Sequence, residues 1–150
     1  MDPADRIGAE AIVLLALFAD IHANRQAFTA CLDFARARGA QRFICLGDYV
    51  GYGADPEWAV ETVMGLVEQG AIAVRGNHDN AIGASAESMN AEAQAAIEWT
   101  RGRLSAPERR FLSELPLTRR KTIASMCIPK PASPNDGVMS ARPRMPGGAF

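Results

Sequence analysis

The chain has 150 residues, enough for one domain with a core of its own, and its formal net charge of −1 gives no basic field that would indicate a nucleic-acid partner. Its longest apolar run, residues 11–19, is too short to cross a bilayer, and the acidic residues before it are unlike a signal peptide. Cys31, Cys45 and Cys127 form no CxxC pair, which argues against a disulfide framework or a zinc knuckle. These features predict a cytoplasmic protein with no membrane partner.

Strands and helices are predicted to alternate along the chain. The first apolar run has the length of a strand that is buried on both faces. Asp55 and Pro56 form a helix N-cap followed by proline at the first helical position, and Ser105 and Glu108 form a capping box. In chain order we expect a strand at 11–18, a helix at about 24–38, a strand at 42–46, a helix at about 56–69, a strand at 71–74, a helix at about 90–103 and a short helix after 105. This order is typical of the α/β class.

The composition changes after Arg120. Five of the nine prolines lie in the last 22 residues, both lysines follow Arg120, and Asp136 is the one acidic residue among the last thirty. No helical or strand periodicity continues beyond about Ile128. We therefore expect residues 1–120 to form the N-terminal part of a domain and residues 121–150 to form a disordered tail.

Each of the three predicted strands ends in polar residues that can bind a metal ion. Asp20 and His22 follow the first strand, Asp48 follows the second, and Asn77 follows the third. The carboxyl ends of strands in an open α/β sheet meet at one crevice, so these side chains are expected to lie together. Asp20 and His22 alternate along an extended segment and can reach one ion, while the two oxygens of Asp48 can bridge two ions. Carboxylate, imidazole and amide donors favour Mn²⁺, Fe or Zn²⁺ over Ca²⁺.

Each of these motifs also has an ordinary structural explanation. An Asp-x-His sequence is common in loops and caps, Gly47-Asp48 alone is a turn, and the segment 77–80 alone is a polar loop. Their occurrence at three successive strand ends, in order, favours one shared metal site over three unrelated loops.

The segments Asp20-Ile-His22-Ala-Asn24, Gly47-Asp48-Tyr-Val-Gly51-Tyr-Gly53 and Gly76-Asn77-His78-Asp79 resemble the first three motifs of the calcineurin-like metallophosphoesterases, especially the small bacterial members. The resemblance covers roughly residues 11–120. It implies a two-layered β-sandwich flanked by helices, with two divalent metal ions (Mn, Fe, Zn or Mg) at its edge.

The resemblance also implies a role for each site residue. Asp20 and His22 would bind the first metal, Asp48 would bridge both metals, and Asn77 would bind the second. His78 would protonate the leaving oxygen or stabilise the transition state, while water activated by the metals attacks phosphorus in line. The expected substrate is a small phosphoester or a nucleotide, and monoester, diester and dinucleotide polyphosphate all remain open.

Two departures from the family pattern change these expectations. Gly51-Tyr52 stands where protein serine/threonine phosphatases have Asp-Arg, so that class of phosphatase is not expected. The family also supplies histidines in Gly-His and Gly-His-x-His motifs after the third motif, whereas His22 and His78 are the two histidines of this chain. We therefore expect the C-terminal half of the sandwich to be missing, at most one metal ion to bind, and hydrolysis to be impaired.

One hypothesis for the tail is a shifted reading frame. From Lys121 onward, the frame that begins at the third base of each codon can encode a strand that enters a histidine, followed by a segment with Trp and Tyr, which resembles the family's fourth region. The alternative is an authentic divergent terminus.

Three interpretations of the chain stay open: a working phosphoesterase that takes ligands from a second subunit, a non-catalytic metal- or phosphate-binding remnant, and a broken gene product. An incomplete sandwich would in addition expose apolar surface through which the chain could associate with itself.

Overall fold

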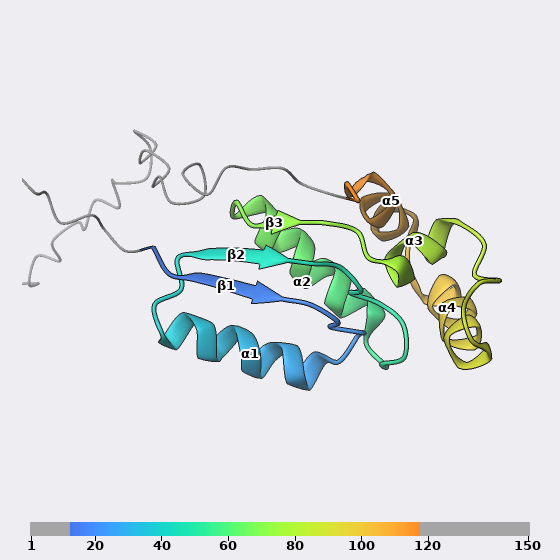
Figure 1. Cartoon of the computed structure of the whole chain (residues 1–150), viewed down its shortest axis with the longest axis horizontal. Coiled ribbons are helices and arrows are strands. Elements are labelled where there is room, and N and C mark those ends of the chain that lie inside the picture. Colours follow the sequence, from blue (N-terminus) through green and yellow to red (C-terminus); the bar gives the residue numbers. More distant parts are fainter. Residues whose placement is uncertain (1–12, 118–150) are drawn as a thin grey trace, which may run out of the picture.

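The computed structural model describes residues 13–117, which form eight helices and strands (Figure 1). In chain order these are β1 (Leu15–Phe18), α1 (Arg25–Ala37), β2 (Arg42–Cys45), α2 (Pro56–Glu68), β3 (Ile72–Ala73), α3 (Asn77–Gly83), α4 (Ala91–Arg103) and α5 (Ala106–Glu114). The predicted α/β alternation is confirmed. The predicted tail at 121–150 lies outside the described residues, so its disorder and its shifted frame stay predictions.

The three strands form one parallel sheet in the order β1-β2-β3. Leu17 lies opposite Ile44, which lies opposite Ile72, and the next residue along each strand forms a second row on the other face. All three strands end at the same edge, as the arrows in Figure 1 show. Of the two layers that the resemblance implies, the described residues therefore form one sheet.

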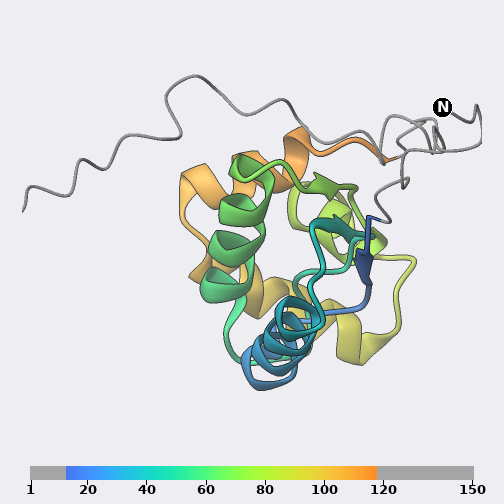
Figure 2. The same cartoon turned by 90° about the vertical axis from the view of Figure 1, so that its left-hand side faces the viewer.

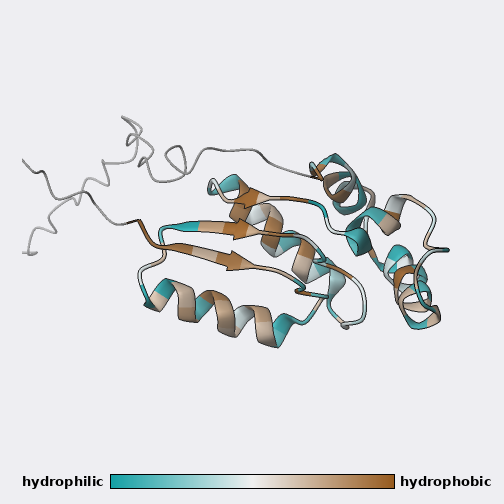
Figure 3. Ribbon diagram, in the orientation of Figure 1, coloured by the Kyte–Doolittle hydropathy of each residue, from teal (hydrophilic) through white to brown (hydrophobic). Residues whose placement is uncertain are grey.

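Helices α1 and α2 lie on the same side of this sheet (Figure 2). Together with side chains of α4 and α5 they enclose one continuous core, to which they contribute Phe28, Leu32, Val60, Val63, Leu66, Ile97 and Leu112. The strands supply the most continuous hydrophobic segments of the chain (Figure 3). Helices α3, α4 and α5 gather beyond the carboxyl ends of the strands. Within the described residues, every helix is too short or too polar to span a membrane.

The predicted helix starts are present in the structure. The backbone N–H of Ser105 donates to the Glu108 carboxylate at 2.6 Å, as expected in the predicted capping box, and the Ser105 hydroxyl donates to the same carboxylate at 2.6 Å. Asp55 is the N-cap of α2 and Pro56 occupies the first helical position, although the Asp55 side chain accepts no capping hydrogen bond. Asn24 caps α1 by accepting from the N–H of Ala27 at 3.0 Å.

The segment after β3 differs from the expectation. No helix was predicted between the strand at 71–74 and the helix at about 90–103, but Asn77–Gly83 forms the helix α3. Seven residues are too few to show a helical hydrophobic period, so the pattern could not reveal this helix. β3 is also shorter than the predicted strand at 71–74. The chain leaves the sheet at Arg75, whose N–H donates to the Pro116 carbonyl at 2.9 Å.

Candidate metal centre

The loops that follow β1 and β2 run side by side beyond the end of the sheet. The N–H of His22 donates to the Asp48 carbonyl at 2.9 Å, and the N–H of Ala23 donates to the Tyr49 carbonyl at 2.8 Å. These bonds continue the pairing of the strands into the loops. They bring the first two motifs together, as the strand-end argument predicted.

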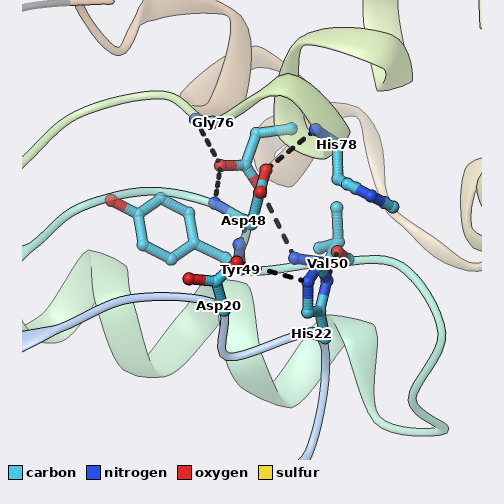
Figure 4. A network of polar contacts seen from close by, with 8 residues as sticks. Asp20, His22, Asp48, Tyr49, Val50, Gly76 and His78 are labelled. Atoms are coloured by element: carbon cyan, nitrogen blue, oxygen red, sulfur yellow. Dashed lines mark hydrogen bonds and ion pairs between the residues drawn. The ribbon is translucent and has the colours of Figure 1, made fainter. Parts of the chain in front are cut away.

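Asp20, His22 and Asp48 form a cluster whose ligand atoms all lie within 4.8 Å of one another (Figure 4). His22 Nδ1 lies 3.1 Å from the Val50 carbonyl, which can only accept, so the ring proton is assigned to Nδ1. The lone pair is then on Nε2, which lies 3.7 Å from the Asp20 carboxylate. A ligating histidine in metalloproteins is commonly oriented by a carbonyl in this way. Two carboxylates and one such imidazole suit a divalent cation such as Mn²⁺, Fe²⁺ or Zn²⁺.

Backbone strain is concentrated at the same place. Among the described residues, five that are not glycine have φ between 46° and 60°, in the left-handed region: Asp20, His22, Ala23, Asp48 and Tyr52. This conformation is uncommon for residues with a Cβ and typically persists where the surrounding structure enforces it. The strain lies in the loops after β1 and β2, which carry the three candidate metal ligands, and backbone strain of this kind typically clusters at functional sites.

Asp79 joins the second motif to the third. Its Oδ2 accepts from the N–H groups of Asp48, at 2.8 Å, and Gly76, at 2.9 Å, while its Oδ1 accepts from Tyr49 at 2.9 Å and from Val50 at 3.4 Å. The side chain is almost fully buried, and this burial raises its pKa to about 6 even though the backbone donors act in the opposite direction. No role was predicted for Asp79 from the sequence. Asp79 is the third residue of α3, whose N-cap is Gly76, and because α3 itself was not predicted this position gave no usable signal in the sequence.

Gly76, the N-cap of α3, allows the segment after β3 to touch the loop after β2. A Cβ at Gly76 would collide with the carboxylate and the backbone nitrogen of Asp48. Only glycine permits this approach, so the close contact between the second and third motifs requires a glycine at position 76.

His78 packs against the cluster. Its backbone N–H donates to Asp48 Oδ1 at 2.9 Å, and its ring centroid lies 4.7 Å from that of His22. The ring is buried, and its Nδ1 lies against Gly51 with no hydrogen-bond partner among the described residues. Burial lowers the pKa of His78, and the charge of His22 acts in the same direction, while Asp48 and Asp20 raise it. The balance favours a neutral imidazole at pH 7.

Asn77, the last predicted ligand, is the first residue of α3 and follows directly after Gly76. Its side chain is exposed and makes no hydrogen bond within the described part of the chain. Its two neighbours in the chain, Gly76 and His78, both contact Asp48. The side-chain amide of Asn77 has no partner within the described residues.

Two cavities open at this centre. The larger, of about 670 Å³, is lined by Asp20, His22 and Asn24 together with residues of α1. The smaller, of about 360 Å³, has His78 and Asn77 in its wall. Tyr52 lines both cavities and separates them.

Comparison with known proteins agrees with this arrangement. Residues 13–133 match the family described as calcineurin-like phosphoesterase. The chain belongs to this family. The resemblance drawn from the three motifs is therefore confirmed, and with it the fold class.

Two relatives show how much of the family fold is present. The chain is 36% identical over 112 residues to "Uncharacterized protein MJ0912" of Methanocaldococcus jannaschii, an alignment that covers 73% of this chain and 45% of that protein. It is 35% identical to the crystal structure of a metallophosphoesterase from Sphaerobacter thermophilus, with a TM-score of 0.57, covering 70% of this chain and 42% of that one. The chain thus spans less than half the length of both relatives.

Proposed function

We propose that the chain is a metal-dependent phosphoester hydrolase, a phosphatase or phosphodiesterase, that acts on a small phosphoester or a nucleotide. The observation that carries this proposal is the cluster of Asp20, His22 and Asp48, with its ligand atoms within 4.8 Å of one another. The match to the calcineurin-like phosphoesterase family supports the same chemistry.

Asp20, His22 and Asp48 would hold one divalent cation (Mn²⁺, Fe²⁺, Zn²⁺ or Mg²⁺). Asp48 and Asn77 alone are too few ligands for a second tight site. When bound, a divalent cation acts as a Lewis acid toward the phosphoryl oxygens and activates water as the nucleophile. The chain's own contribution is orientation. The Val50 carbonyl turns Nε2 of His22 toward Asp20, and the N–H of His78 fixes one oxygen of Asp48.

His78 would interact with the negative charge that develops on the substrate in the transition state. A neutral imidazole can donate one hydrogen bond but carries no additional proton to deliver. Because Nδ1 is buried against Gly51, Nε2 is the nitrogen available to a bound ligand. This favours stabilisation of the transition state over protonation of the leaving oxygen, the two roles that the resemblance left open.

Two measurements on one sample test the proposal. Calorimetry with Mn²⁺ should show at most one site, which Asp48→Ala removes and which Asp33→Ala, an exposed aspartate on α1, leaves intact. Hydrolysis of an activated aryl phosphate should be metal-dependent and about 10²–10³-fold slower than that of a full-length relative, the usual cost of losing one source of charge stabilisation.

Each outcome of that test has a definite meaning. Two tight Mn²⁺ sites would contradict the single-site expectation. Mn²⁺ binding without any hydrolysis would replace the proposal with the alternative, a non-catalytic metal-binding remnant. Hydrolysis that is unaffected by Asp48→Ala would show that the activity arises elsewhere.

A further inference from the structure

The smaller cavity, beside His78, is lined by residues other than Asp20, His22 and Asp48, the three residues of the metal cluster. It lies between α3, the connection from α3 to α4 and the first turn of α4, and Tyr52 lines its side toward the metal cluster. In Figure 1 this connection forms the end of the molecule beyond the carboxyl ends of the strands. Its volume of about 360 Å³ lies at the lower end of the range for ligand pockets.

The wall of this cavity is polar and, with His78 neutral, uncharged. It consists mainly of amide and hydroxyl side chains, from Asn77, Asn80, Ser85, Ser88 and Asn90, and its described lining includes no Lys, Arg, Asp or Glu. The side chains of Asn77, Asn80 and Ser88 make no hydrogen bonds within residues 13–117. Their donors and acceptors are therefore available to a ligand.

The cavity adjoins the candidate active site. The rings of His22, Tyr52 and His78 lie with their centroids 4.7 to 5.0 Å apart. The proposed metal ligand His22 therefore packs directly against two residues that line the cavity, Tyr52 and His78. The Tyr52 side chain is 53% exposed and shows an aromatic surface on this path. A phosphoester with its phosphorus at the Asp20–His22–Asp48 cluster would reach this cavity with its organic group.

We propose that this cavity binds the organic group of the substrate, and that this group is an uncharged nucleoside; the inference rests on the hydrolase function proposed above. Amide side chains pair with the donor and acceptor edges of bases, and an exposed aromatic ring offers a stacking surface. Further phosphates would face neutral side chains in this wall. The structure therefore favours a nucleoside monophosphate ester over a polyphosphate chain.

Adenosine is the probe, titrated into metal-free protein and followed by ligand-observed NMR. Asn80→Ala and Ser88→Ala should each weaken adenosine binding about three- to tenfold, the range expected for the loss of one hydrogen bond. Gln26→Ala is the matched control, because Gln26 lines the larger cavity. It should leave binding unchanged. Equal binding by Asn80→Ala and the unchanged protein, loss of binding in Gln26→Ala alone, or no adenosine binding at all would overturn the inference.

Mn²⁺ calorimetry on the same variants separates this inference from the proposed function. Asn80→Ala should bind Mn²⁺ as the unchanged protein does, since Asn80 is not among the proposed ligands. Weaker adenosine binding with Mn²⁺ binding intact supports the nucleoside site. Absence of Mn²⁺ binding in every variant would refute the hydrolase proposal, while the metal-free adenosine titration would still decide whether the cavity binds a nucleoside.

Discussion

The two faces of the sheet are covered to different degrees. On the face toward α1 and α2, the row Phe18–Cys45–Ala73 is packed into the core, and Cys45 is fully buried. On the other face, the row Leu17–Ile44–Ile72 is apolar as well, but Leu17 is 59% exposed and the two isoleucines are only partly buried. Parallel sheets occur almost only with both faces covered. Within the described residues, one face therefore lacks its covering layer.

The same difference runs through the metal centre. The Asp20 side chain, after the edge strand β1, is 70% exposed, whereas Asp79 is buried and accepts four backbone hydrogen bonds. The second and third motifs are thus held together by backbone hydrogen bonds to one buried side chain, that of Asp79. The half that contains Asp20 is held mainly by backbone pairing.

The largest effect expected from this comparison is on stability. Leu66, on α2 and in the core, and Leu17, on the open face, are the same residue type in opposite surroundings. Leu66→Ala should lower the free energy of unfolding by about 2–5 kcal/mol, because it leaves a cavity in a packed core. Leu17→Ala should change it by no more than about 0.5 kcal/mol, as at other surface positions. Urea unfolding of both variants gives the comparison, and equal losses would mean that the open face is covered in solution.

Asp79 gives the next largest effect, which depends on pH. Its folded-state pKa of about 6 lies above that of an ordinary aspartate, so the folded chain binds this proton more tightly than the unfolded chain. The resulting stability is fully present below about pH 4 and is lost as the pH rises through about 6, by about 3 kcal/mol at most. Metal-free protein is compared with Asp79→Asn, which does not titrate.

The stability of the unchanged protein minus that of Asp79→Asn should fall between about pH 4 and pH 6 and stay constant above. The carboxyl carbon of Asp79 should titrate by NMR with a midpoint near 6. A difference that is flat, or that rises over this range, would show that the four backbone donors outweigh burial.

Much of the fold could be predicted because its signals are local. The capping box of Ser105 and Glu108 spans three residues, and the apolar strand at β1 is continuous in sequence. Helix α3 escaped prediction because a seven-residue helix with a polar start shows no period. A missing covering layer was expected from the lack of the distal motifs, and within residues 13–117 the exposed Leu17 is consistent with that expectation.

The site was predictable only where chain order implies proximity. Asp20, His22 and Asp48 follow adjacent strands, and parallel strands end at one edge, so their meeting could be predicted. The bond from Asp48 N–H to Asp79 joins residues 31 apart, and that from His22 to Val50 joins residues 28 apart. Such contacts, like the left-handed backbone of the loops, follow from how the loops pack against each other. No spacing in the sequence encodes them.

The smallest expected effect concerns self-association through the open surface. Leu14 just before β1, Leu17 in β1 and Phe34 in α1 are exposed, beside an apolar cavity of about 650 Å³ between these two elements. Exposed apolar surface of this kind promotes association and binds hydrophobic dyes. Leu17→Lys should reduce dye fluorescence and weaken association about tenfold or more, because burying one leucine contributes roughly 1.5–3 kcal/mol.

Leu117→Lys is the matched control, since Leu117 is 63% exposed but lies after α5, away from β1 and α1. It should leave dye binding and the elution volume close to those of the unchanged protein. Because Leu17 is already exposed, Leu17→Lys should unfold at the same urea concentration, so a change in elution reports association and not unfolding. An unchanged protein that binds no dye and stays monomeric at high concentration would show that the row Leu17–Ile44–Ile72 is covered, and the two faces of the sheet would then be alike.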